Sequence, residues 1–327
     1  MAHYLVRQLY TNPPAQDLAS VRVNGWVRTM RQSKTFAFVV LNDGSYFENL
    51  QIVLEADKLP DYAEVTKAIG VGASIEAEGT LVLTPGNQQP FELKAERLTV
   101  LGESPSDYPL QKKRHTLEYL RTIQHLRPRA NLFQCVFRVR SVAAQAIHRF
   151  FHDKGYVYVH TPLITGSDCE GAGEMFRVTT LDPDALPMTD AGQVDYAKDF
   201  FGKPVSLTVS GQLNAEIFAM AFRDVYTFGP TFRAEASYTP RHAAEFWMIE
   251  PEIAFADLAV DMDLQEEMVK YIIAAVLEEC PQEMKFLNSF VDKNLIERLT
   301  FVRDAEFVRC SYTDAIEILK NSGEKFE

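Results

Sequence analysis

The feature that most constrains this chain is a series of short β-favouring segments in its first hundred residues. Apolar and polar residues alternate from Val21 to Arg28, as expected for a strand with one buried face. The turn-prone sequence Asn42-Asp43-Gly44 ends a second such run. We expect strands at 21–28, 36–41, 50–54, 73–83 and 91–101, with a short helix at 60–69.

Five short strands with one helix between the third and the fourth form the layout of an OB-fold barrel. SH3-like and other small β-barrels share parts of this order, so the pattern alone leaves those folds open. Gly102-Glu103-Ser104-Pro105 then interrupts the pattern, as a domain boundary does. We therefore expect an all-β OB-fold barrel over residues 1–104.

The rest of the chain mixes helical and strand patterns. Helical spacing of apolar residues covers 136–154, 213–221, 264–279 and 312–320, and strands are expected at 156–160, 205–209 and 225–229. This mixture predicts an α+β domain over 131–327, with helices flanking a largely antiparallel sheet.

A basic stretch lies in the predicted hinge, 105–130, between the two domains. From Lys112 to Arg129 it holds six Lys and Arg residues against the single acid Glu118. A solvated helix face is the plain interpretation of such a run. Its place between two domains favours contact with a polyanion.

Bulk properties exclude several classes of protein. The net charge of −12 argues against indiscriminate nucleic-acid binding, because that binding depends on neutralising phosphates. No apolar run approaches the roughly 18 residues needed to cross a bilayer, and no secretory signal is visible at the N-terminus. The four cysteines are widely spaced, which favours a reducing compartment, the cytoplasm, over zinc or disulfides.

A polar loop between two apolar runs carries the strongest functional signal. Arg233 and Glu235 are two residues apart, so on a strand both side chains face the same way. Arg233 has the planar fork that grips phosphate or carboxylate, and Glu235 can accept from a base amino group. Arg241 and His242 add cations suited to a polyphosphate, and Phe246 offers an aromatic face.

The order Phe-Arg-x-Glu, loop, Arg-His and Glu-Phe resembles motif 2 of class II aminoacyl-tRNA synthetases, particularly those for Asp, Asn and Lys. The resemblance implies that Arg233 is the catalytic residue, binding the α-phosphate of ATP and the amino-acid carboxylate. It implies that Glu235 meets the adenine amino group and that Phe246 stacks on the adenine. Arg241 or His242 would then hold the outer phosphates, which Mg²⁺ accompanies.

Further segments are similar to the amino-acid pocket of the asparaginyl enzymes. A Gly-rich loop places Glu170 where the family holds the substrate α-amino group, and Ser210 and Gln212 match its Ser-x-Gln-Leu element. Ala215 stands where aspartyl enzymes usually carry a Lys, so an aspartate substrate would lack its cation. Glu250 can accept from a carboxamide and repel a carboxylate, which favours L-asparagine as substrate.

The resemblance also gives the barrel and the second domain their partners. In related enzymes the OB-fold reads the anticodon, and the matching residues here are Arg31, Phe38 and Gln51, which implies tRNA(Asn) as partner. The helix 136–154 with the strand leading to Pro162 is similar to motif 1, which forms a homodimer interface. The acidic segment Asp182–Asp199 looks like an insertion of the bacterial enzymes.

Motif 3 is missing from the resemblance. The expected Gly-rich strand with an Arg for the ATP γ-phosphate is not found after Tyr312, and metal ligands are expected beyond Glu327. The sequence is therefore interpreted as a C-terminally truncated asparaginyl enzyme. An aspartyl enzyme, an asparagine synthetase on the same catalytic fold and a non-catalytic RNA-binding or dimerisation fragment remain the alternatives.

Overall fold

The computed structural model describes residues 2–87, 89–169, 171, 174–239 and 241–324. By its internal contacts the chain divides into two compact units. The first comprises Met1–Val142 and Val276–Thr300, and the second comprises Ala143–Ala275 and Phe301–Glu327. The predicted domains were consecutive stretches of chain, whereas the first unit also takes in a segment from the C-terminal third.

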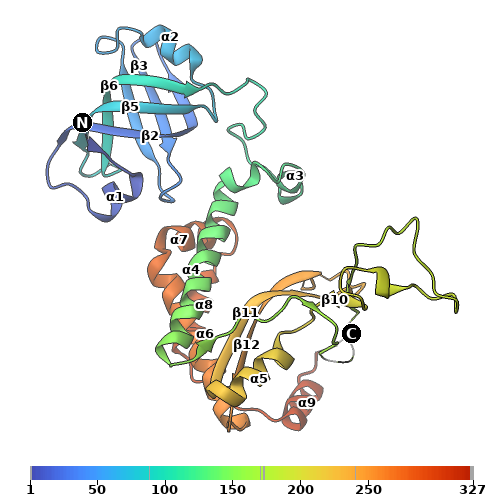
Figure 1. Ribbon diagram of the computed structural model, residues 1–327. Coiled ribbons are helices and arrows are strands. Elements are labelled where there is room, and N and C mark those ends of the chain that lie inside the picture. The colour runs from blue at the N-terminus through green and yellow to red at the C-terminus, as the bar shows by residue number, and fades with distance from the viewer. Residues whose placement is uncertain (1, 88, 170, 172–173, 240, 325–327) are drawn as a thin grey trace. The chain divides into compact units, whose positions relative to one another are not determined.

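A closed β-barrel forms the start of the first unit (Figure 1). Its elements are β1 (Ala2–His3), α1 (Val6–Thr11), β2 (Leu18–Gln32), β3 (Phe36–Asn42), β4 (Leu50–Glu55), α2 (Tyr62–Ala68), β5 (Ser74–Leu83) and β6 (Phe91–Gly102). The strand order is β1-β2-β3-β4-β6-β5, and an additional β2–β5 pairing closes the barrel. The predicted OB-fold is confirmed. Sequence reasoning missed β1 and α1, because two strand residues are too few to show a period.

Period-two alternation explains why these segments close into a barrel. The inward positions of β2 and β3, such as Val21, Val23 and Val39, are fully buried, while their neighbours along each strand are more exposed. Gly79 on β5 lies against β6 so closely that a Cβ there would come within 2.0 Å of the Lys94 carbonyl oxygen. A glycine at this bulge therefore lets the two strands approach.

Helices complete the first unit. They are α3 (Leu117–Thr122), η1 (Arg127–Arg129), the first part of α4 (Asn131–Asp153), α7 (Pro281–Phe290) and most of α8 (Leu295–Asp304). The helix α4 was predicted from residue 136 and begins five residues earlier. Helices α7 and α8 were not predicted, although Pro281 at the first turn of α7 is a common helix-start signal.

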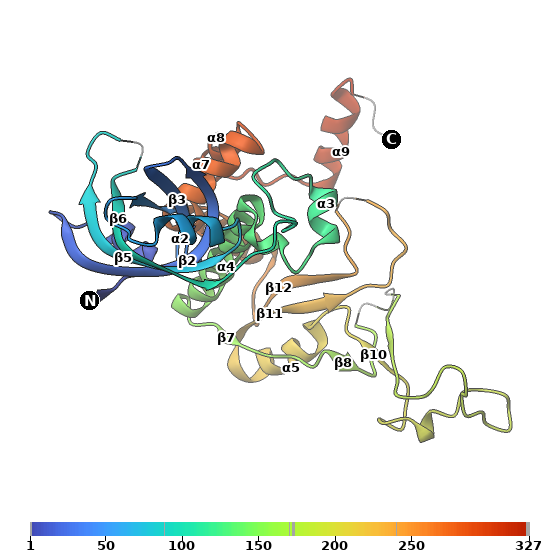
Figure 2. The same cartoon turned by 90° about the horizontal axis from the view of Figure 1, so that it is seen from above.

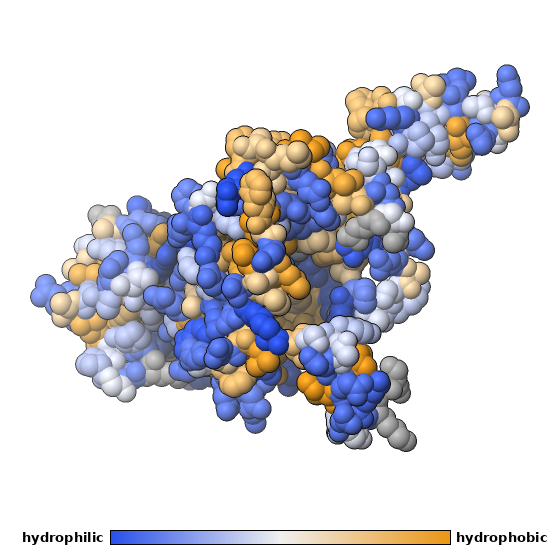
Figure 3. All heavy atoms as spheres, turned by 90° about the horizontal axis from the view of Figure 1, so that it is seen from below, coloured by the Kyte–Doolittle hydropathy of each residue, from blue (hydrophilic) through white to orange (hydrophobic). Residues whose placement is uncertain are grey.

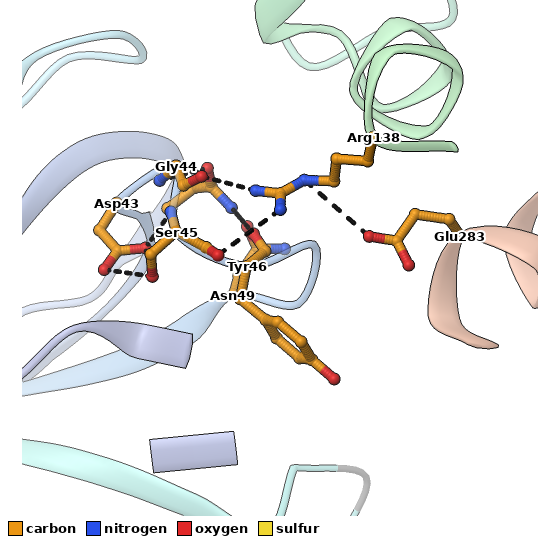
Figure 4. Close-up of polar contacts among 8 residues, drawn as sticks. Asp43, Gly44, Ser45, Tyr46, Asn49, Arg138 and Glu283 are labelled. Carbon is orange, nitrogen blue, oxygen red and sulfur yellow. Dashed lines mark hydrogen bonds and ion pairs between the residues drawn. The ribbon is translucent and has the colours of Figure 1, made fainter. Parts of the chain in front are cut away.

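A loop of the barrel is fixed to these helices by Arg138 of α4 (Figure 4). Its guanidinium donates to the carbonyl oxygens of Gly44 at 2.6 Å and Ser45 at 3.5 Å. Its Nε lies 3.9 Å from a carboxylate oxygen of Glu283, which is 6% exposed. Phe47 of the same loop packs edge-on against Phe286 of α7. The β3–β4 loop is thus anchored to both α4 and α7.

The second unit is an α+β fold, as predicted. Its elements are β7 (Val157–Tyr158), β8 (Ile164–Thr165), β9 (Arg177–Val178), η2 (Tyr196–Lys198), β10 (Val205–Leu207), α5 (Gln212–Phe222), β11 (Asp224–Phe232), β12 (Glu245–Ile253), α6 (Leu258–Glu279) and α9 (Tyr312–Asn321). The sheet order is β12-β11-β7, with β11 and β12 antiparallel along their whole length, and β8-β10-β9 forms a small antiparallel sheet. Figure 2 shows β11 and β12 side by side. Phe151 of α4 stacks on Tyr226 of β11, with ring centroids 4.4 Å apart.

One local prediction was wrong. Arg233 and Glu235 were expected on a strand, but β11 ends at Phe232. The Arg233 N–H still donates to the Ala244 carbonyl at 3.1 Å, whereas the next N–H, of Ala234, donates to Glu174 in another loop at 2.7 Å. The pairing of β11 with β12 therefore ends here, because the backbone of Ala234 bonds to Glu174 and no longer to the chain leading into β12.

Candidate functional site

The strand pair β11–β12 positions the first part of the site. Phe246 lies on β12 opposite Thr231, so its ring stands at the end of the ladder beside the chain that leaves β11. The half-buried Arg233 places its guanidinium carbon 5.5 Å from the Phe246 ring centroid. A cation held over an aromatic face is attracted by the ring quadrupole. The structure thus brings together the predicted phosphate-binding cation and the predicted adenine-stacking ring.

The loop between the two strands carries the other predicted ATP contacts. Glu235, Arg241 and His242 are all exposed there. The loop is held locally, because the Thr239 hydroxyl contacts the His242 ring and accepts from the Arg241 N–H at 3.3 Å. The structure places these three side chains on the loop above the strand ends and leaves them open to solvent.

Glu250 is the most firmly held side chain of the site. It lies on β12 directly opposite Thr227 of β11, whose hydroxyl donates to one carboxylate oxygen at 2.8 Å. The Ser210 hydroxyl and the Gly211 backbone N–H, at the start of α5, also donate to this carboxylate. An ionised carboxylate accepts about four hydrogen bonds. The Gly211 N–H is shared between both oxygens, so these three donors make four contacts and hold Glu250 in place.

Gly211 is required where α5 meets Glu250. A Cβ at this position would lie 2.7 Å from the Thr161 hydroxyl oxygen and 3.2 Å from a Glu250 carboxylate oxygen. Both distances are shorter than ordinary contacts. The glycine therefore permits the close approach that lets its own N–H reach the carboxylate.

The structure separates the two predicted members of the Ser-x-Gln-Leu element. Ser210 is buried and donates to Glu250. Gln212 is exposed on α5, and its amide donates to Glu216 at 2.9 Å. Of these two residues, Ser210 contacts Glu250 in the described structure and Gln212 contacts Glu216.

Ala215 has a packing role that sequence reasoning did not anticipate. It was compared with a Lys that faces the substrate, but it is fully buried in a cluster with Val159 and Val225. The small side chain lets α5 pack against β11. Ala215 therefore serves packing in the described structure.

Glu252 is a functional candidate that sequence reasoning missed. It lies two residues beyond Glu250 on β12, and the two-residue period puts both on one face. Burial, and after it the negative charges of Glu216 and Glu250, raises the pKa of Glu252 to about 7. The Glu-Pro-Glu spacing is the sequence signal that could have revealed this carboxylate pair.

The Gly-rich loop approaches the site through its backbone. Glu170, predicted to bind the substrate ammonium, lies outside the described residues. Asp168 accepts from the Gly171 N–H at 3.2 Å, and the Glu174 carbonyl accepts from Ala234 at 2.7 Å. The end of this loop is therefore hydrogen-bonded to the residue next to Arg233.

Asp199 anchors the acidic insertion and was also missed as a structural residue. Its buried carboxylate accepts from the Thr179 hydroxyl at 2.6 Å, from the backbone N–H and hydroxyl of Thr180, and from the Phe200 N–H. These hydrogen bonds, that from Thr179 first, hold the pKa of Asp199 well below its usual range. The two ends of the insertion are thus tied at its base.

The barrel places the three predicted anticodon residues on one outer face. Arg31 of β2 pairs with Phe38 of β3. Gln51 of β4 pairs with Val40, which lies two residues after Phe38 on the same face of β3. Phe38 is 41% exposed. Phe36, 46% exposed on the same face, and Glu92, which accepts from the Gln51 amide at 3.1 Å, were not predicted. We call the surface formed by Arg31, Phe36, Phe38, Gln51 and Glu92 the reading face.

Three further properties concern membrane spans, metal sites and cysteines. No described helix is long and apolar enough to cross a membrane. Among the described residues, no group of three or more His, Cys, Asp and Glu side chains has the arrangement of a metal site. All four cysteines are free thiols.

Comparisons with known proteins agree with this geometry. A family model described as tRNA synthetases class II (D, K and N) matches residues 116–327. A second, described as OB-fold nucleic acid binding domain, matches residues 21–101. The asparagine–tRNA ligase of Desulfitobacterium hafniense (strain Y51) is 61% identical over 327 residues, which are 100% of this chain and 70% of that protein. That of Clostridium perfringens (strain SM101 / Type A) is 59% identical over 323 residues, 99% of this chain and 69% of that protein.

Solved structures are similar as well. The asparaginyl-tRNA synthetase of Pyrococcus horikoshii, complexed with asparaginyl-adenylate, aligns with a TM-score of 0.82 at 25% identity. The alignment covers 100% of this chain and 69% of that one. The Entamoeba histolytica asparaginyl-tRNA synthetase aligns with a TM-score of 0.78 at 22% identity, covering 99% and 67% of the two chains, and shows the same fold.

Proposed function

The chain belongs to the class II aminoacyl-tRNA synthetases, among the asparagine–tRNA ligases, and from this premise we propose how its own residues perform the reaction. The enzyme activates L-asparagine with ATP to give asparaginyl-adenylate and pyrophosphate, and then transfers the asparaginyl group to tRNA(Asn). In the first step a carboxylate oxygen of asparagine bonds to the α-phosphorus of ATP, and the bond from that phosphorus to pyrophosphate breaks. Positioning and charge neutralisation are the main requirements of such a step.

Arg233 is the residue that meets those requirements in this proposal. Its guanidinium can bridge the attacking carboxylate and the α-phosphate, where negative charge concentrates during the reaction. Its position over the Phe246 ring is what supports the role, because the adenine and the α-phosphate of one ATP must lie close together. Phe246 then stacks against the adenine, and Glu235 accepts from the adenine amino group.

The exposed loop cations complete the ATP site in this proposal. Arg241 and His242 bind the outer phosphates once ATP is present, which their exposure allows. Mg²⁺ accompanies those phosphates, since this ion usually keeps several waters and is shared between one or two carboxylates and the substrate.

The fixed position of the Glu250 carboxylate is the observation that best supports asparagine as the amino-acid substrate. Its carboxylate is held in place by three donors, one of which, the Gly211 N–H, is shared between both oxygens. A carboxamide N–H₂ can donate to this carboxylate, whereas a second carboxylate would be repelled. Ser210 acts by orienting Glu250. Gln212, exposed at the start of α5, contributes to amino-acid binding, and Glu170 holds the substrate ammonium group.

We propose that the reading face binds the anticodon of tRNA(Asn). Exposed aromatic rings stack on unpaired bases, and Phe38 offers such a ring between Arg31 and Gln51. The functional division is then a reading barrel over 1–104, a basic hinge over 105–130 and a catalytic domain over 131–327.

We also propose a homodimer formed through the helix 136–154 and the strand that leads to Pro162. The apolar Val157 and the aromatic Tyr158, both on β7, are exposed. Apolar side chains also gather over α5, as Figure 3 shows, including Ile217 at 67% exposed. Exposed apolar surface of this kind commonly marks a subunit interface. The free thiols fit our assignment of the enzyme to the reducing cytoplasm.

ATP–pyrophosphate exchange tests this function. We expect exchange that depends on L-asparagine and is not supported by L-aspartate at the same concentration. Exchange driven by aspartate would show that Glu250 does not select the amide.

A further inference from the structure

A surface pocket of about 550 Å³ lies in the second unit. Its walls come from the end of α4, the middle of α6 and the last turn of α8. The described residues that line it include none of those assigned above to ATP or to the amino acid. Pockets of roughly 300–1,000 Å³ commonly bind small organic molecules. The chemistry of the lining therefore indicates which class of molecule this pocket suits.

The floor of the pocket is apolar and mostly aromatic. Phe150 is 5% exposed and belongs to a core cluster of the second unit. Tyr271 packs against it, with ring centroids 5.5 Å apart and the two planes inclined at 52°. Ala274 follows Tyr271 by three residues on α6, and its small side chain leaves room beside the ring. Two inclined rings offer a planar aromatic ligand both a face and an edge to pack against.

Cationic side chains surround this floor. They are Lys154, Lys270 and Arg303, and they outnumber the acids among the described lining residues, which are Asp153 and Glu267. In a chain with a net charge of −12, such an excess of cations is a local feature that attracts anions. The pocket therefore combines an aromatic floor with a cationic rim.

Two of the rim cations are held only by exposed ion pairs. Lys154 pairs with Glu267, and Arg303 pairs with its neighbour Asp304 at 2.6 Å. Exposed pairs of this kind contribute little to stability, so an anionic ligand can replace the protein carboxylates at small cost. Lys270 is held more firmly, because its ion pair on α6 is partly buried. Lys154 and Arg303 are therefore the cations best suited to meet a ligand.

We propose that this pocket binds an aromatic carboxylate, with its ring on Phe150 and Tyr271 and its charged group at Lys154 and Arg303. The Lys154 Nζ already lies 5.2 Å from the Phe150 ring centroid, so cation and aromatic surface are presented together. Ammonium and guanidinium groups form strong, charge-assisted hydrogen bonds to a carboxylate. The site is separate from the proposed ATP site, which has its own cation and ring in another part of the unit.

A charged probe and its neutral counterpart test the proposal. The probes are 2-naphthoate and 2-naphthamide, which share one aromatic body, and each is titrated into the chain by isothermal titration calorimetry. We expect one molecule of 2-naphthoate to bind per chain, about tenfold more tightly than 2-naphthamide. The K154Q/R303Q variant should bind 2-naphthoate about 10- to 30-fold more weakly and 2-naphthamide within about twofold of the wild type. The charge-conserving K154R/R303K variant should bind 2-naphthoate within about threefold of the wild type.

Further variants show where the probe binds. Y271L removes one ring of the floor and should weaken both probes about tenfold. R97Q/K293Q removes two exposed cations of the first unit and should change neither affinity. R233A removes the cation of the proposed ATP site and should leave 2-naphthoate binding intact. Absence of saturable 2-naphthoate binding, unchanged affinity in K154Q/R303Q or lost affinity in R233A would each overturn the proposal.

Discussion

The reading face and the amino-acid pocket use the same device, a register between neighbouring strands, but they prepare it differently. On the barrel, Phe38 and Phe36 stay exposed beside Arg31. In the pocket, Glu250 is held by three donors before any substrate is bound. The proposed stacking of unpaired bases tolerates motion of the reading face, whereas the proposed discrimination between an amide and a carboxylate needs a fixed acceptor. The comparison indicates that rigidity is required around Glu250 and less so on the reading face.

The largest effect should come from the chemistry of the second unit. R233A should lower asparagine-dependent ATP–pyrophosphate exchange about 10²- to 10³-fold, because one preorganised cation at the developing charge is removed. The thermal midpoint should change less than the rate, since a cation–π contact contributes about 0.5–2 kcal/mol. R97A, which removes an exposed cation from the barrel, is the control and should leave exchange intact. Near-normal exchange in R233A would refute the role of Arg233.

A change on the reading face should affect only the RNA step. F38A should weaken tRNA charging about 10- to 100-fold, because stacking of a base on an aromatic ring contributes about 1–3 kcal/mol. Pyrophosphate exchange without tRNA should stay at the wild-type rate. L101A removes another exposed apolar side chain of the barrel and should alter neither activity. Parallel loss of both activities in F38A would mean that Phe38 is a packing residue.

The importance of a rigid pocket can be tested without substituting Glu250 itself. G211A should raise the KM for asparagine about tenfold, because the added methyl group would press on Thr161 and Glu250 and weaken the hydrogen bonds to the carboxylate. G229A on β11 is a matched control, since a Cβ there meets nothing within 4 Å. An unchanged KM in G211A would mean that the fixed position of Glu250 is unimportant.

The smallest expected effect is a pH dependence of stability. The carboxyl of Glu252 ionises near 4.5 when unfolded and near pH 7 when folded. Between these values the folded state holds a proton that the unfolded state has released, so this group makes stability fall as pH rises from about 4.5 to 7. E252Q should remove this part of the pH dependence, so that the urea concentration at the unfolding midpoint varies less between pH 4.5 and 7. An unchanged pH profile in E252Q would show that Glu252 titrates normally.

The sequence predicted the barrel well because its signal is local. Positions such as Val21, Val23 and Val39 alternate with polar neighbours, and alternation determines both the strand and its buried face. Arg31, Phe38 and Gln51 of the reading face followed from a family resemblance, and the strand register places them on one surface.

What could not be predicted depends on contacts between distant residues. The strand β11 ends where it does because Ala234 bonds to Glu174, and no local pattern announces that exchange. Ala215 was interpreted only as the absence of a substrate-binding Lys, because packing of α5 on β11 is invisible in the sequence. Burial of Ser210 against Glu250 joins residues forty positions apart.

The central claim is that Glu250 selects asparagine, and its most direct test is amino-acid-dependent ATP–pyrophosphate exchange in the wild type and in E250Q. We expect the wild type to prefer asparagine over aspartate by more than about 10³-fold in kcat/KM, in line with sites whose buried polar groups read a substrate hydrogen bond. E250Q should lose activity with asparagine and reduce that preference to about tenfold or less, since the repelling charge is gone. E245Q, at the exposed start of β12, should retain the wild-type ratio. A full preference for asparagine in E250Q would contradict the account.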